Sequence, residues 1–127
     1  MLFPMIIDSM TAKHEVDTLI RTVIDCETNI AVGMIGCKGL PDAEGRIEIG
    51  YGIIESHWNR GYASESVSTF TQWLLAQPEI TCITAECRVD NIGSARVLEK
   101  SGFLETGSRE DPEDGPLMLW ERNTEVD

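Results

Sequence analysis

Hydrophobic residues repeat with two different periods in the middle of the chain. A period of two over residues 46–54 predicts a strand, with Ile47 and Tyr51 on the same face. A helical period follows from residue 63 to residue 74, and Pro78 ends it because proline cannot continue a helix. The sequence therefore predicts a strand, a turn and an amphipathic helix over about thirty residues.

The same patterns predict three strands, a helix, a strand, a helix and two further strands along the chain. Residues 1–13 show no clear period, and the acidic run 110–114, which contains Pro112, predicts an exposed loop between the last two strands. The other strands are expected at 18–25, 30–37, 80–89, 103–108 and 117–122, and the second helix at 91–102, opened by Asp90 or Asn91 and closed by Gly102.

The turn between the central strand and the first helix has features of an anion site. The first N–H groups of a helix have no partner within it and lie at the positive end of its dipole, so they attract phosphate. Arg60 adds a positive charge, and Gly61 allows a ligand to approach the backbone closely. A plain turn without a ligand is the alternative, because glycine is common at helix starts.

A second segment makes the ligand hypothesis more specific. The order of Trp58-Asn-Arg-Gly-Tyr-Ala63, a strand, and Asn91-x-x-Ser-x-Arg-Val-Leu-Glu-Lys-x-Gly-Phe103 resembles the GNAT superfamily of N-acetyltransferases. Within it, the ribosomal-protein N-terminal acetyltransferase-like (Rim-type) branch is the most similar. Gly61 and Ala63 match the family's acetyl-CoA loop, whereas Trp58 departs from its general pattern and is usual for this branch. The resemblance extends over roughly residues 30–122.

The resemblance implies an α/β (α+β) fold with a mixed, mostly antiparallel sheet, a splayed parallel strand pair and flanking helices. It also implies that acetyl-CoA lies between the strands at 46–54 and 80–89, with its pantetheine arm paired like an added strand. Arg96 is expected to be an exposed helical residue rather than a phosphate ligand. The residues expected to bind the cofactor are Ile53, Ile54, Asn59, Arg60, Gly61, Tyr62, Ala63, Ser64, Asn91 and Ser94.

Acetyl transfer to an amine requires a base, and Glu48 is the candidate. Its side chain lies on the face opposite Ile47, on the strand beside the cofactor, and a carboxylate there can accept the amine proton through water. A solvent-facing glutamate is the alternative, and Glu86 is a weaker candidate. Many members of the family carry a proton-donating tyrosine where this chain has Leu98, which leaves the general acid open. Tyr51 is expected in the core.

Length and the family pattern together bear on the organisation of the chain. We expect one acetyltransferase domain over residues 1–127. Only about seventeen residues precede the first predicted hairpin, fewer than the strand and helices that open other members of the family, so the chain looks shortened at its N-terminus. An exposed sheet edge would allow a homodimer.

Charge and cysteine content narrow the set of partners. The 22 acidic and 10 basic residues give a net charge of −12, which argues against nucleic acid and suits a cationic acceptor. No apolar run is long enough to span a membrane. Cysteine spacing indicates buried thiols in a cytoplasmic protein, and with His14 and His57 as the two histidines we expect no metal site and an exposed His57. The cysteines are Cys26, Cys37, Cys82 and Cys87.

The leading interpretation is an acetyl-CoA-dependent N-acetyltransferase that moves the acetyl group directly to a primary amine. The amine is a peptide N-terminus or a small molecule, and the sequence does not choose between them. A CoA-binding sensor or scaffold without catalysis is the second hypothesis, because Leu98 and the short N-terminus weaken the case for an enzyme. A purely structural interaction domain is the third, although such a domain has no need of the Trp58–Ser64 turn.

Overall fold

The computed structural model describes residues 5–8 and 20–124. The order of strands and helices after residue 20 is the predicted one, with β1 added before it and a short 3₁₀-helix, η2, before α1. The elements are β1 (Met5–Asp8), β2 (Ile20–Asp25), β3 (Ile30–Cys37), β4 (Arg46–Ile53), η2 (Glu55–His57), α1 (Tyr62–Leu75), β5 (Cys82–Arg88), α2 (Ile92–Lys100), β6 (Leu104–Asp111) and β7 (Gly115–Asn123).

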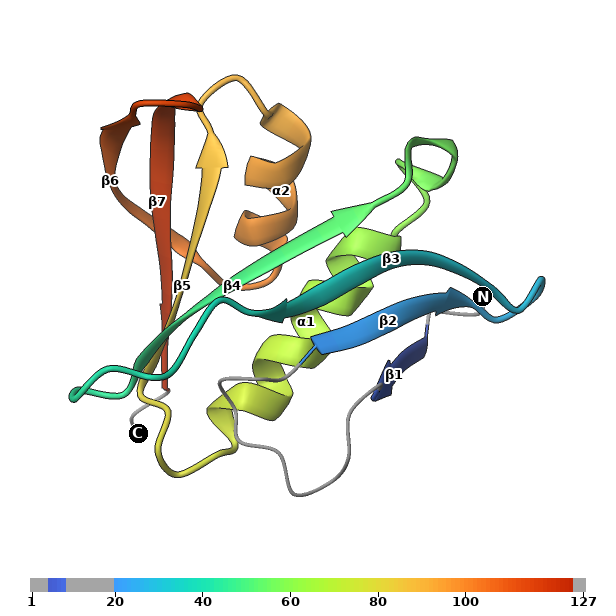
Figure 1. Cartoon of the computed structure of the whole chain (residues 1–127), viewed down its shortest axis with the longest axis horizontal. Helices are drawn as coiled ribbons and strands as arrows, with labels where there is room; N and C mark the ends of the chain where they lie inside the picture. Colours follow the sequence, from blue (N-terminus) through green and yellow to red (C-terminus); the bar gives the residue numbers. More distant parts are fainter. Residues whose placement is uncertain (1–4, 9–19, 125–127) are drawn as a thin grey trace.

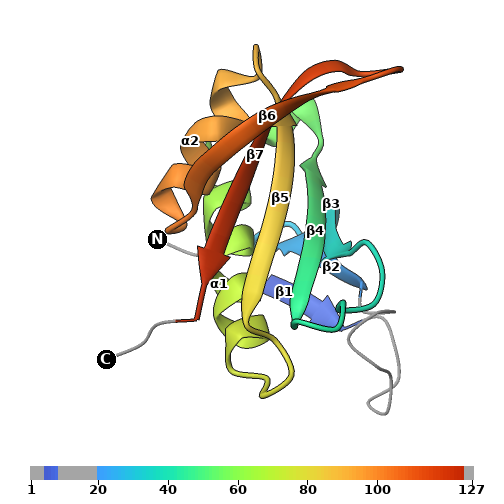
Figure 2. The same cartoon turned by 90° about the vertical axis from the view of Figure 1, so that its left-hand side faces the viewer.

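The strands form one sheet in the order β1-β2-β3-β4-β5-β7-β6 (Figure 1). Every neighbouring pair is antiparallel except β4 and β5. Helices α1 and α2 contact one another and lie on the same side of the strands (Figure 2). The predicted mixed, mostly antiparallel sheet with flanking helices is confirmed.

The core lies between this sheet and the helices. Ile47 and Ile49 of β4 point inward with 2% of their surface exposed, and Val67, Phe70 and Leu74 of α1 meet them. Burying side chains of this size contributes about 1.5–3 kcal/mol each. Because alternate residues of a strand face opposite ways, this burial directs Glu48 to the face without helices.

The acidic hairpin between the last two strands is tighter than predicted. The sequence suggested a loop over residues 110–114, but β6 continues to Asp111 and β7 begins at Gly115. The Asp111 carboxylate accepts hydrogen bonds from the N–H groups of Glu113 and Asp114 at 3.0 and 2.9 Å, and Gly115 supplies a φ of 78°. These contacts close the turn, and the backbone hydrogen bonds lower the pKa of Asp111.

The beginning of the chain contains a strand that the sequence pattern did not reveal. Met5–Asp8 forms β1, which pairs antiparallel with β2 from Met5 opposite Ile24 to Asp8 opposite Arg21. The opening strand is therefore present, and residues 9–19 lie outside the described part of the chain. The predicted start of β2 at residues 18 and 19 lies there too.

The cysteines do not all follow the prediction of buried thiols. Cys82 and Cys87 are buried on opposite faces of β5, as expected, but Cys37 is half-buried and Cys26 is exposed. Cys26 lies in the turn between β2 and β3. Neither described helix is long and apolar enough to cross a membrane.

Arg122 of β7 joins the ends of both helices to the sheet. Its guanidinium donates to the Thr71 hydroxyl of α1 at 3.0 Å and to the Ser101 carbonyl after α2 at 2.9 Å. Replacing Arg122 with methionine keeps most of the packing and removes both donors. We expect a loss of about 2–3 kcal/mol in the free energy of unfolding, measured by urea denaturation.

Arg88→Met is the matched control for that substitution. Among the described residues, Arg88 forms an ion pair with Asp90, at 3.1 Å and on the surface, and such pairs contribute less than about 1 kcal/mol. Equal stability losses in the two variants would contradict the anchoring role of Arg122.

Candidate functional site

The parallel pair β4 and β5 opens into a gap. The two strands pair from Arg46 opposite Cys82 to Glu48 opposite Thr84, and no further pair forms between them in the described residues. β4 then runs on to Ile53 and β5 to Arg88, and Figure 1 shows the two strands diverging. A splayed strand pair leaves backbone groups without a strand partner.

Hydrogen bonds to β3 show which backbone groups of β4 face this gap. The Lys38 N–H donates to the Glu48 carbonyl and the Ile54 N–H to the Val32 carbonyl, both at 2.8 Å. The backbone N–H and C=O groups of even-numbered residues in β4 therefore point toward β3. The backbone groups of odd-numbered residues point toward β5. Beyond the paired region these are the backbone groups of Tyr51 and Ile53. An extended ligand in the gap would meet these groups.

This geometry changes one of the predicted backbone contacts. Ile54 directs its N–H to β3, and its carbonyl accepts from the His57 N–H at 2.9 Å, so neither group is available to a ligand. Ile53 faces the gap, although its carbonyl accepts a hydrogen bond from Trp58 Nε1 at 2.7 Å. Tyr51 therefore replaces Ile54 in the candidate set, because alternation along the strand turns the Ile54 backbone toward β3 and the Tyr51 backbone toward the gap.

The turn before α1 presents unpaired N–H groups. Gly61 is the N-cap with a φ of 87°, and the first helical hydrogen bond runs from the Glu65 N–H to the Gly61 carbonyl. Within the described residues, no acceptor pairs with the N–H groups of Tyr62, Ala63 or Ser64. A Cβ atom on Gly61 would have no neighbour within 4 Å, so the approach to these groups is open. This is the geometry of an anion site.

Asn59 and Arg60 complete the turn. Asn59 also has a positive φ, 62°, which asparagine tolerates better than most residues, and Arg60 is exposed. The backbone reverses sharply before the helix as a result, with a positive side chain beside the free N–H groups.

A small cluster beneath the turn joins it to β2. Asp25 is 6% exposed, and its carboxylate lies 3.6 Å from Nε2 of His57, whose ring meets Tyr62 edge to face at 5.4 Å. Burial raises the pKa of the Tyr62 hydroxyl, and the neighbouring Asp25 carboxylate raises it further. His57 is therefore half-buried against a carboxylate, which corrects the expectation of an exposed loop histidine.

The first turn of α2 places two further predicted residues at the gap. Asn91 caps the helix, and its Oδ1 accepts from the Ser94 N–H at 3.0 Å. The Ser94 hydroxyl lies 2.6 Å from the hydroxyl of Tyr51. Leu98 is fully buried in the core, Arg96 is exposed as expected, and Gly102 ends the helix with a φ of 92°.

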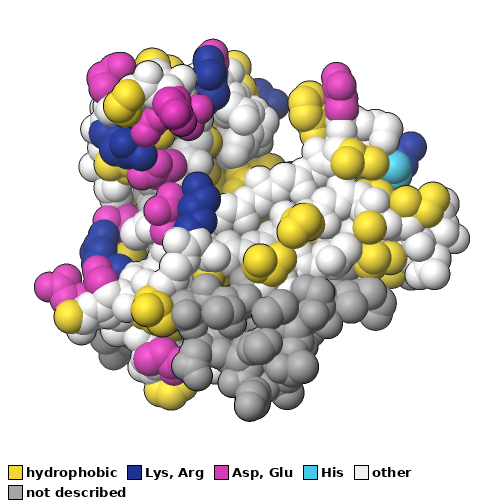
Figure 3. Space-filling view, viewed as in Figure 1, with side chains coloured by type: hydrophobic (Ala, Val, Ile, Leu, Met, Phe, Trp, Pro, Cys, Tyr) yellow, Lys and Arg dark blue, Asp and Glu magenta, His cyan; other side chains and the backbone are white. Residues whose placement is uncertain are grey.

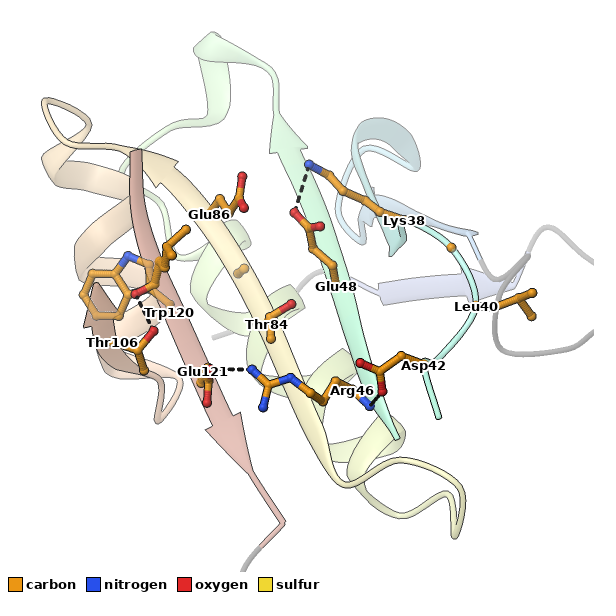
Figure 4. A pocket seen from close by; sticks show the side chains of 13 residues that line it. Lys38, Leu40, Asp42, Arg46, Glu48, Thr84, Glu86, Thr106, Trp120 and Glu121 are labelled. Carbon is orange, nitrogen blue, oxygen red and sulfur yellow. Dashed lines mark hydrogen bonds and ion pairs between the residues drawn. The ribbon is translucent and has the colours of Figure 1, made fainter. Parts of the chain in front are cut away.

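The opposite face of the sheet carries a pocket of about 420 Å³ (Figure 4). Glu48 lines it from β4 and Glu86 lines it from β5, so each of the two diverging strands contributes one carboxylate. Lys38 Nζ lies 3.6 Å from Glu48, whereas Glu86 is held by two hydrogen bonds from Arg109 at 2.8 and 3.0 Å. Glu48 is the less constrained carboxylate. The other charged side chains of the pocket are Asp42, Arg46 and Glu121.

Charged side chains are unevenly distributed over the surface of the sheet. Charged side chains gather over β5, β6 and β7, while the surface over β3 and β4 carries fewer of them, and a notch separates the α2 side from the turn after β4 (Figure 3). Met34 of β3 and Trp58 of the turn are more than half exposed. Across residues 5–8 and 20–124, no cluster of three or more His, Cys, Asp or Glu side chains could hold a metal ion.

The gap, the turn and the capped helix agree with a known family. Residues 5–104 match the profile of the acetyltransferase (GNAT) domain family. The chain belongs to this family. One relative, the uncharacterised N-acetyltransferase YjdG of Bacillus subtilis (strain 168), is 42% identical over 73 residues, which are 58% of this chain and 44% of YjdG.

Two further proteins that the chain resembles are named as acetyltransferases of ribosomal proteins. The ribosomal-protein-serine acetyltransferase of Escherichia coli (strain K12) is 29% identical over 76 residues, 60% of this chain and 42% of that protein. The structure of RimL, a ribosomal L7/L12 α-N-protein acetyltransferase, in complex with coenzyme A superposes with a TM-score of 0.77 at 20% identity, covering 86% of this chain and 63% of RimL. The chain spans less than half the length of the two curated relatives.

Most of the GNAT site residues predicted from sequence lie around the gap. Their roles in binding remain predictions. Sequence reasoning missed the Trp58 hydrogen bond to Ile53 and the Asp25–His57 contact, because both join residues whose proximity depends on the folded turn. The predicted residues lie at the end of β4, in the turn and start of α1 that follow it, and at the start of α2, with Glu48 on the opposite face of the sheet; they are Ile53, Asn59, Arg60, Gly61, Tyr62, Ala63, Ser64, Asn91 and Ser94.

Proposed function

We propose that this GNAT domain is an acetyl-CoA-dependent N-acetyltransferase that acts by direct transfer to a primary amine. The observation that supports it most is the set of unpaired N–H groups on Tyr62, Ala63 and Ser64, next to a gap between parallel strands. A diphosphate fits the first feature and an extended amide-containing arm fits the second. Acetyl-CoA contains both groups.

The residues of the turn would hold the diphosphate, with Arg60 adding charge and Asn59 and Gly61 setting the backbone. Tyr51 and Ile53 would pair with the pantetheine arm, and Asn91 and Ser94 would line its other side. RimL, which shares the fold, binds coenzyme A. The thioester supplies an activated acetyl group, so the protein needs to orient it and remove a proton from the amine.

The pocket around Glu48 suits a cationic acceptor. Four carboxylates line it against two basic side chains, Lys38 and Arg46. Arg46 is already hydrogen-bonded to Glu121, so the charge near Glu48 favours an ammonium group over an anion. Glu48 then accepts the amine proton, directly or through water, before the nitrogen attacks.

The fully buried position of Leu98 favours one alternative, a GNAT domain that binds acetyl-CoA without turning it over. The hydroxyl that many members of the family place there is absent. Such a protein would act as a sensor or scaffold. Strand β6 is an exposed edge of the sheet, so two copies could pair along it to form a homodimer that suits this role.

A thiol-release assay separates the two functions. The chain is incubated with acetyl-CoA and a panel of peptide N-termini, polyamines and simple amines, while calorimetry measures acetyl-CoA binding in parallel. The proposal predicts acetyl-CoA binding and amine-dependent release of CoA. Binding without release on any amine would favour the sensor, and absence of binding would reject both functions.

A further inference from the structure

A pair of hydroxyl groups links β4 to α2 beside the gap. The Tyr51 hydroxyl lies 2.6 Å from Ser94 Oγ and 3.5 Å from the Ser94 carbonyl. Ser94 is held in place because Asn91 accepts a hydrogen bond from its N–H. The Tyr51 ring is half-buried and packs against the core, as its place on the face of Ile47 and Ile49 predicts, while its hydroxyl lies at the N-terminal end of α2.

Tyr51 and Glu48 lie on opposite faces of the same strand. Ile47, Ile49 and Tyr51 share the face that meets the helices, whereas Glu48 lines the pocket on the other face. A thioester in the gap between β4 and β5 would have the carboxylate on one side and the phenol on the other. Attack by an amine from the Glu48 side would leave the sulfur accessible from the helix side.

A proton donor beside the departing sulfur would assist breakage of the C–S bond. Leu98 offers none, and Tyr51 and Tyr62 are the two tyrosines of the chain. Tyr62 packs against His57 beside the Asp25 carboxylate, beneath the turn. Burial raises the pKa of Tyr51, so its hydroxyl stays protonated at neutral pH and remains a donor.

We propose that Tyr51 is the proton donor to the leaving sulfur, an inference that rests on the proposed acetyltransferase function. The amine nitrogen forms the C–N bond and loses its proton to Glu48 or water. The C–S bond breaks, its electron pair passes to sulfur, and sulfur takes the proton of the Tyr51 hydroxyl. Ser94 holds the phenol in position, and the tyrosinate regains a proton from solvent.

The first test compares wild type with Tyr51→Phe on two acyl donors. With acetyl-CoA, kcat should fall on the order of 100-fold while the Kd for acetyl-CoA changes less than about threefold. With the selenoester analogue of acetyl-CoA, the loss should be less than about fivefold, because a selenolate leaves without a proton donor. A packing defect would reduce both rates equally, and that result would overturn the proposal.

The second test does not require turnover. The thiolate of bound CoA is titrated by its ultraviolet absorbance, and a hydroxyl that donates to sulfur lowers the pKa of the thiol. We expect that pKa to be about one unit lower in wild type than in Tyr51→Phe. If Tyr51→Phe does not fold, a pKa lower for wild-type-bound CoA than for free CoA supports the proposal.

The two tests separate failure of the Tyr51 assignment from failure of the enzyme assignment. An unshifted thiol pKa in wild type overturns the role of Tyr51 whether or not an amine is acetylated. A shifted thiol pKa without turnover of any amine shows that Tyr51 contacts the sulfur of bound CoA, but it rejects the transferase and with it the role of Tyr51 in breaking the thioester. Absence of CoA binding rejects both.

Discussion

Replacing Gly61 with valine is expected to reduce acetyl-CoA affinity by at least about 100-fold, or about 2.7 kcal/mol. Gly61 has a φ of 87° and open space where a Cβ would be, immediately before the unpaired N–H groups of α1. A branched side chain there would occupy the space through which a diphosphate reaches those groups. Calorimetric titration with acetyl-CoA measures the loss.

Gly115→Val is the matched control for this substitution. Gly115 also has a positive φ, 78°, with nothing within 4 Å of its Cβ position, but it lies in the β6–β7 turn. Both variants should lose about 1–3 kcal/mol of stability from backbone strain. Only the Gly61 variant should lose affinity. Equal affinities in the two variants would show that the turn does not bind the cofactor.

Replacing Glu48 with glutamine is expected to lower kcat by about 100- to 1,000-fold with little change in the Kd for acetyl-CoA. The side chain is 35% exposed, lines the pocket on the open face of the sheet, and forms an ion pair with Lys38. Glutamine keeps its size and hydrogen bonding but cannot accept a proton. Steady-state thiol release measures the loss, using the acceptor that gives the fastest turnover with wild type.

Glu86→Gln provides the comparison for Glu48. Glu86 lines the same pocket, but two hydrogen bonds from Arg109 hold its carboxylate. A carboxylate whose oxygens are held by a guanidinium is less free to meet an incoming amine, so its loss should lower kcat less than about tenfold. If Glu86→Gln is the more damaging substitution, the base lies on β5 and the Glu48 assignment is wrong.

The regular elements could be predicted because their sequence periods are also their burial patterns. Ile47 and Ile49 alternate inward, and Val67, Phe70 and Leu74 follow one face of α1, so pattern and packing agree. β1 could not be predicted in this way. A four-residue strand is too short to show a period, and its pairing with β2 depends on a contact distant in sequence.

The candidate site was predictable where it depends on local geometry and unpredictable where it depends on contacts across the fold. Gly61, Asn91 and Gly102 have the backbone roles that their residue types suggest. Sequence could not show that Tyr51 reaches Ser94, because that bond joins a strand to a helix forty-three residues further on. It also could not show that the Ile54 backbone is already paired, since this depends on the register with β3.

The most direct test compares the affinity of wild type for acetyl-CoA with its affinity for S-acetylpantetheine, which has the same thioester and amide arm without the diphosphate. If the N–H groups at the start of α1 bind the diphosphate, calorimetry should show acetyl-CoA binding at least about 100-fold more tightly. Equal affinities, or no heat with either compound, would contradict the account.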